Sequence, residues 1–268
     1  MSDAVRSGPL GALGRVVIAA LHWLGTMGYL VQDTGAALFV GPLRGQPVRR
    51  EAVAAQMMRV GVRAIPIVFV VVFFIGVIVA IQLAVIMKRF GVQEFIASVV
   101  GVATVRELGP LMTGIVLSGF AGASIAAELG TMKVGEEIDA MVSSALSPYR
   151  FLVAPRVLAC VIMMPVLTVF ANAMGILGGF VVSVGLLDIS AELYIDRTIE
   201  AMDVKDVMTG LFKAGVFGAV IGFVSCLAGL EVRGGAAGVG RATTAAVVLG
   251  ILSIIVSDCV FTAIFFYV

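Results

Sequence analysis

Four ionisable residues interrupt long apolar stretches of the sequence: Arg106, Glu107, Lys213 and Asp258. An ionisable side chain at membrane depth is unfavourable by several kcal/mol unless it faces a partner or a water-filled cavity. Arg106 and Glu107 are adjacent, so on a helix they point about 100° apart and do not pair with each other. Each of them therefore needs a partner from another part of the chain or from a ligand.

Two interpretations of these charges stay open. Glu107 and Lys213 could form an ion pair between two helices, which is a structural role. Alternatively, Arg106, Glu107 and Lys213 could line a cavity that meets charged headgroups. For Asp258 we favour the structural role, a hydrogen bond to a neighbouring helix.

A second group of charges surrounds a short amphipathic stretch between two apolar runs. Ile138, Met141, Val142 and Ala145 have i, i+3, i+4, i+7 spacing and predict a helix over about 131–146 with one apolar face. The charged residues of this block are Glu128, Lys133, Glu136, Glu137 and Asp139. Such a helix could simply lie on the bilayer. An anionic inner leaflet attracts bases, however, so an acidic helix suits a protein partner better.

Residues with the spacing of an enzyme active site are not found. The only histidine is His22, and there is no paired-aspartate metal motif or phosphate-binding loop. The cysteines Cys160, Cys226 and Cys259 lie in apolar runs, where cysteine behaves as a small buried hydrophobe. No basic cluster with interleaved aromatic residues predicts nucleic-acid binding. We expect no catalytic residue, metal or cofactor, and a separate chain must bind ATP if ATP drives this protein.

The composition predicts an all-α integral membrane protein. Of the 268 residues, 60% are hydrophobic and 13% are charged, whereas soluble domains carry roughly 25% charge. Residues 1–48 predict an amphipathic helix in the membrane interface, with a packed cytoplasmic helix as the alternative. Residues 49–268 form one transmembrane domain, and we expect residues 95–105 to begin a long second helix rather than form a separate one. The predicted spans are about 64–87, 105–127, 152–187, 207–230 and 242–267.

Small residues recur every fourth position in several of these spans. Gly114, Ser118 and Gly122 are one such series, and Gly218 and Gly222 are another. Small side chains on one helix face let a second helix backbone approach closely. The spacing therefore predicts a tightly packed helical bundle.

The distribution of lysine and arginine predicts the orientation. With the N-terminus in the cytoplasm, the inner segments hold twelve of these residues and the outer loops hold four, namely Lys88, Arg89, Arg197 and Lys205. Inner segments of membrane proteins carry the excess of basic residues. We therefore expect a cytoplasmic N-terminus, a cytoplasmic acidic helix and a periplasmic C-terminus.

The sequence resembles the MlaE/YrbE family, the permease subunits of MCE-type ABC lipid transporters. Four stretches carry the resemblance in the same order: RELGP at 106–110, AGASIAAELGTMKVGEEIDAM at 121–141, SPYRFLVAPRVLA at 147–159 and GVGRATTAAVV at 238–248. The resemblance extends from about residue 45 onward, whereas the N-terminal part is similar in character only.

The resemblance implies a homodimer in a bacterial inner membrane that moves phospholipid for outer-membrane lipid homeostasis. It implies that the helix after Glu128 couples to a cytoplasmic ABC ATPase through Glu128, Lys133, Glu136, Glu137 and Asp139. It further implies a periplasmic MCE-domain protein, expected as a hexamer, and in some members a STAS-domain partner. Arg106 and Glu107 then correspond to charged residues of a lipid cavity, with Lys213 in a matching place. The alternatives are an ion-coupled secondary transporter or a structural anchor for a periplasmic ring.

Overall fold

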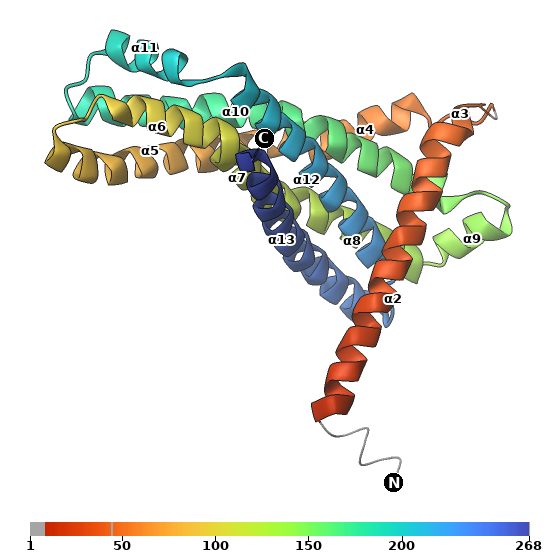
Figure 1. Cartoon of the computed structure of the whole chain (residues 1–268). Helices are drawn as coiled ribbons and strands as arrows, with labels where there is room; N and C mark the ends of the chain where they lie inside the picture. Colours follow the sequence, from red (N-terminus) through yellow and green to blue (C-terminus); the bar gives the residue numbers. More distant parts are fainter. Residues whose placement is uncertain (1–8, 44, 268) are drawn as a thin grey trace.

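The computed structural model describes residues 9–43 and 45–267, and this part of the chain contains helices and no β-strand (Figure 1). Five helical runs are long and apolar enough to cross a membrane, which confirms the predicted fold class. They are Arg50–Phe90, Phe95–Val134, Tyr149–Leu186, Val204–Leu230 and Gly235–Phe265. All five begin before the predicted spans. In four of them polar flanking residues continue the helix beyond its apolar part, whereas the second begins with the apolar residues 95–103.

The N-terminal segment forms α2 (Pro9–Gly35), the π turn η1 (Ala36–Val40) and the short α3 (Gly41–Leu43). Figure 1 shows α2 running obliquely past the end of the bundle, and it contacts α12 (Val204–Leu230). Trp23 packs against the core and Leu30 is buried, whereas Leu21 and Leu24 are exposed. One face of α2 therefore covers the bundle and an apolar face stays open. The location of this helix in a membrane interface stays a prediction.

The first span comprises α4 (Arg50–Val60), the 3-10 turn η2 (Val62–Ala64) and α5 (Ile65–Phe90). The third span comprises the π turn η5 (Tyr149–Val153) and α10 (Ala154–Leu186). α10 is the central helix, with α5 and α12 packed against it.

Glycines make the close packing around α10 feasible. A Cβ atom at Gly178 would collide with the backbone carbonyl of Phe73 in α5, and one at Gly218 would collide with that of Cys160. These contacts confirm the predicted close approach of helix backbones at small residues.

The second span is one continuous helical run, as predicted, with two wide turns in it. It consists of α6 (Phe95–Ala103), the π turn η3 (Thr104–Leu108), α7 (Gly109–Leu117), the π turn η4 (Ser118–Gly122) and α8 (Ala123–Val134). Single π turns inside α-helices occur frequently at functional sites. Here η3 contains both Arg106 and Glu107.

Three of the segments between spans contain helix, and one of them differs from the sequence-based expectation. The predicted helix over 131–146 is divided: α8 continues to Val134, and α9 spans only Glu137–Ser143. The polar segment 188–206 contains a helix, α11 (Ala191–Ala201). The glycine-rich connection that follows α12 is short, because α13 (Gly235–Tyr267) begins within it.

Divided helices in the 131–146 region follow from the local backbone. Glu136 adopts the left-handed conformation with φ of 59°, directly after Gly135. A residue in that conformation cannot continue a right-handed helix, so α8 and α9 change direction there. Ala145, with φ of 58°, marks the same kind of break after the far end of α9.

Candidate functional site

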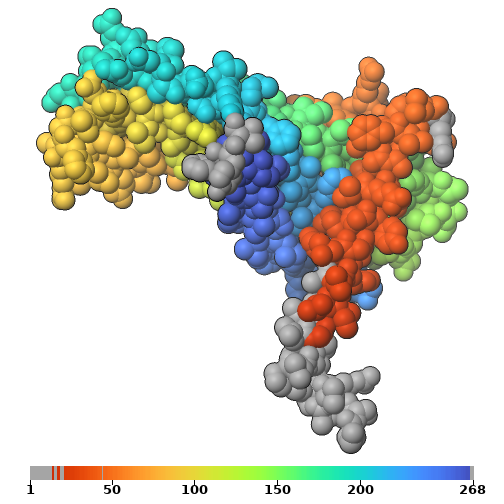
Figure 2. Space-filling model, viewed as in Figure 1, coloured from red at the N-terminus to blue at the C-terminus, as the bar shows by residue number. Residues whose placement is uncertain are grey.

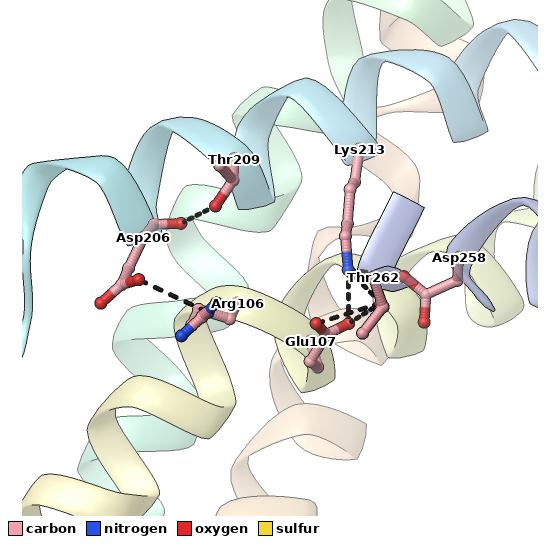
Figure 3. Close-up of polar contacts among 7 residues, drawn as sticks. All are labelled: Arg106, Glu107, Asp206, Thr209, Lys213, Asp258 and Thr262. Carbon is pink, nitrogen blue, oxygen red and sulfur yellow. Dashed lines mark hydrogen bonds and ion pairs between the residues drawn. The ribbon is translucent and has the colours of Figure 1, made fainter. Parts of the chain in front are cut away.

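Lys213 lies at the centre of a polar cluster within the spans (Figure 3). Its Nζ donates to Glu107 Oε2 at 2.6 Å, to Asp258 Oδ1 at 3.0 Å and to Thr262 Oγ1 at 2.8 Å. An ammonium group has three protons to donate, so these contacts satisfy all of them. We call these four residues the Lys213 cluster.

Three helical runs supply the Lys213 cluster. Lys213 comes from α12, Glu107 comes from the π turn η3, and Asp258 and Thr262 come from α13. Asp258 and Thr262 are four residues apart, so they lie on the same helix face. The predicted pairing of Glu107 with Lys213 is therefore present, and so is the predicted contact of Asp258 with a neighbouring helix.

The Lys213 cluster carries an excess of negative charge. One ammonium faces two carboxylates, and the Lys213 side chain is only 2% exposed. The Asp258 side chain is 14% exposed and that of Glu107 is 35% exposed. Of the charged members of the cluster, Glu107 is thus the one that a ligand or water can reach most easily.

Arg106 points away from Glu107 and pairs with another residue. Its Nε lies 3.4 Å from Asp206 Oδ1 in the first turn of α12, and Thr209 Oγ1 donates to the Asp206 carbonyl at 3.0 Å (Figure 3). Asp203 and Asp206 form a capping box that starts α12, which fixes the position of Asp206 beside Arg106. The Arg106 side chain remains 45% exposed.

A cavity of about 50 Å³ separates these two groups of charges. Its lining residues are Arg106, Glu107, Thr209, Lys213, Thr262 and Phe265. A volume of this size holds one or a few water molecules. The single chain therefore offers a small polar recess with a guanidinium at one side and a carboxylate at the other.

The predicted coupling residues divide into two sets. Glu128 is bound within the chain: it accepts from Arg59 Nη1 at 2.7 Å and lies 3.1 Å from Arg156 Nη2. Arg156 is buried, and its Nη1 donates to the Leu152 carbonyl at 2.7 Å. These contacts join α4, α8 and α10, so Glu128 connects the base of the bundle.

The remaining coupling residues lie around α9. Lys133, in α8, pairs with Asp139 at 2.7 Å and so bridges the turn between the two helices. Glu136 and Glu137 are exposed, and among the described residues their carboxylates have no hydrogen-bond partner and no ion pair. Ile138 is buried against the bundle. A groove of about 620 Å³ runs beside α9, lined by apolar residues as well as Lys133 and Asp139.

Sequence reasoning missed several residues that complete these sites. They are Thr209, Thr262, Asp206, Arg59 and Arg156. Thr262 had a usable signal, since it lies one helical turn from Asp258 in an apolar span. Asp206 had none, because an acid at a helix start is most simply explained as a cap.

Comparison with known proteins identifies relatives of this chain. The family described as permease MlaE matches residues 53–264. A probable ABC transporter permease protein of Rickettsia conorii is 40% identical over 222 residues, covering 83% of this chain and 86% of the relative. A probable ABC transporter permease protein of Synechocystis is 37% identical, with 82% and 84% covered. Protein TRIGALACTOSYLDIACYLGLYCEROL 1, chloroplastic, of Arabidopsis thaliana is 34% identical, with 79% and 60% covered.

The family match covers all five candidate spans, apart from the first and last few residues of that region, and includes both charged sites. The relatives named as ABC transporter permeases match most of this chain and most of their own length. The chain is a multi-pass membrane protein and belongs to the MlaE family of ABC transporter permeases.

Proposed function

We propose that this chain is the permease of an ATP-driven transporter that moves phospholipid, with the Lys213 recess binding the headgroup. The observation that carries the proposal is the Lys213 cluster, a buried cation held by two carboxylates within apolar spans of an ABC permease. Charged residues inside membrane spans mark substrate pathways by default. The recess presents Arg106 and Glu107, which suit the phosphate and the ammonium of a zwitterionic headgroup respectively.

The lipid class of substrate has a second line of support. The Arabidopsis relative carries the name of a lipid, trigalactosyldiacylglycerol, in its own name. The recess beside Lys213 lies within the membrane spans, which is where a lipid substrate would reach it.

The proposed working unit is a homodimer. A recess of about 50 Å³ is far smaller than the roughly 300–1,000 Å³ of ligand-binding pockets. In the single chain, α13 lies at the surface (Figure 2) and exposes Val248, Leu252, Val256 and Val260. A second copy packed along α13 would enlarge the recess into a cavity shared by two Lys213 clusters.

The proposed energy source is ATP hydrolysis on a separate cytoplasmic chain. Two unpaired acids, Glu136 and Glu137, stand exposed beside the groove along α9, and they would contact basic or amide groups of the ATPase. The Lys133–Asp139 pair would transmit movement of α9 to α8. On the opposite membrane face, we propose that a periplasmic MCE-domain protein receives or delivers the lipid, in the service of outer-membrane lipid homeostasis.

Reconstitution tests the proposed function. The permease, co-purified with its ATPase, is placed in vesicles, and transfer of a fluorescent phospholipid is followed with ATP and with a non-hydrolysable analogue. We expect ATP-dependent transfer, and a loss of transfer in the Glu107→Gln variant with ATPase binding unchanged. Transfer that needs no ATPase and follows an ion gradient would instead identify a secondary transporter.

The coupling site has its own test. Substituting Glu136→Lys and Glu137→Lys reverses two exposed charges and should abolish co-purification with the ATPase. A matched charge reversal at Glu192, which is exposed on α11 at the other end of the bundle, should leave co-purification intact. If ATPase binding and ATP-stimulated transfer both survive the double substitution, the docking role of α9 is wrong.

A further inference from the structure

A second charged crevice lies at the opposite end of the second span from the Lys213 cluster. It has a volume of about 360 Å³ and is lined by Arg59, Arg63, Phe120, Ser124 and Glu128. It is therefore several times larger than the recess beside Lys213. We call it the Arg63 crevice.

The charges around the Arg63 crevice do not cancel. Glu128 is the only acid that lines it, and that carboxylate is already paired with Arg59 and with the buried Arg156. Arg63 is exposed, and among the described residues it has no hydrogen-bond partner or ion pair. Arg59, Arg63 and Arg156 together carry three positive charges against the one negative charge of Glu128, so two positive charges remain in excess. The Arg63 guanidinium has all of its donors available.

The uncharged lining residues add two further features. The hydroxyl group of Ser124 is exposed and makes no hydrogen bond to any described residue. The ring of Phe120 is 38% exposed at the apolar side of the crevice. A guanidinium and a hydroxyl beside an apolar surface match a phosphate that is attached to a hydrocarbon chain.

The position of the Arg63 crevice places it at the edge of the membrane. Arg63 directly precedes the uncharged run 64–87 of the first span. Ser124 lies seventeen positions after Glu107 in one helical run, which corresponds to about 25 Å along the helix axis. The hydrocarbon core of a bilayer is about 30 Å thick. The crevice and the Lys213 cluster are therefore separated by a distance comparable to most of the hydrocarbon thickness.

We propose that the Arg63 crevice binds the phosphate of an anionic phospholipid at the membrane face opposite to the Lys213 cluster. Arg63 and Ser124 bind the phosphate oxygens, and the Arg59–Glu128–Arg156 ion pairs hold the wall of the site in place. Phe120 packs against the first carbons of the acyl chains. Retention of a lipid in the Arg63 crevice does not depend on transport, so its test is independent of the test of the proposed function.

Native mass spectrometry tests the proposal without nucleotide. The full chain with its co-purifying subunits is incubated in detergent with phosphatidylglycerol or with phosphatidylcholine, and retained lipid is quantified. We expect a retained phosphatidylglycerol that Arg63→Gln weakens about tenfold, because one charge-assisted hydrogen-bonding group is lost. Ser124→Ala should weaken retention by a smaller factor.

Arg50→Gln is the matched control. Arg50 is exposed at the start of α4 and carries the same charge as Arg63, but it does not line the crevice. Equal losses in the two arginine variants would overturn the proposal in favour of general attraction to a basic surface. Retention of phosphatidylglycerol and phosphatidylcholine to the same extent would also overturn it. Displacement of the lipid by millimolar glycerol 3-phosphate would overturn the lipid assignment and identify a site for soluble phosphate.

Discussion

Replacing Lys213 with methionine tests how strongly its cluster stabilises the bundle. Methionine keeps much of the length of lysine, but it removes the three donated hydrogen bonds and leaves Glu107 and Asp258 without a counter-charge. Removing one partner of a buried ion pair destabilises a protein by about 3–5 kcal/mol. Water can reach Glu107, whose side chain is 35% exposed, so we expect a loss near the lower limit, about 3 kcal/mol.

The assay is equilibrium unfolding of the purified protein in mixed micelles, followed by circular dichroism. Lys88→Met is the matched control, because Lys88 is exposed at the end of α5 and its loss should change stability by less than about 0.5 kcal/mol. A triple variant, Lys213→Met with Glu107→Gln and Asp258→Asn, removes all three charges and should regain most of the lost stability. The reasoning is refuted if Lys213→Met is as stable as Lys88→Met, or if the triple variant is no more stable than the single one.

Two further predictions concern packing and the base of the bundle. Gly178→Ala should destabilise the bundle by about 1–3 kcal/mol in the same unfolding assay, because the added Cβ meets a backbone carbonyl. The control is Gly185→Ala, where the added Cβ has no packing neighbour within 4 Å, and its stability should be unchanged or slightly higher. Glu128→Ala should cost about 3 kcal/mol because it leaves the buried Arg156 without its carboxylate, whereas Asp139→Ala breaks an exposed pair and should cost less than about 1 kcal/mol. Equal effects of the two acidic substitutions would contradict the burial argument.

The spans and the central ion pair could be predicted from sequence because both follow from one physical requirement. A bilayer excludes charge, so long uncharged runs mark the spans and the few charges within them must find partners. Glu107, Lys213 and Asp258 stand out for this reason alone. Thr262 gives a weaker signal, because a threonine in a span can satisfy its own hydroxyl within the helix, and only its position one turn from Asp258 points to it.

The end of the bundle around α9 was harder to predict because its structure depends on contacts between distant residues. The apolar spacing from Ile138 to Ala145 continues past the end of α9, which the backbone terminates at Ser143. Glu128, whose role in coupling to an ATPase stays a prediction, pairs with two arginines of its own chain. Nothing in the local sequence around Glu128 indicates which arginines of the chain lie beside it.

The two wide turns of the second span have a consequence for its tolerance of length changes. In an uninterrupted α-helix, removing one residue rotates everything beyond it by about 100° and shortens it by about 1.5 Å. A π turn already accommodates one surplus residue. Losing a residue from Ser118–Gly122 would therefore convert that turn to ordinary α-helix and leave α7 and α8 in their present mutual phase. The span can therefore lose one residue in this stretch and keep Glu107 and Glu128, on either side of it, in their present relative orientation.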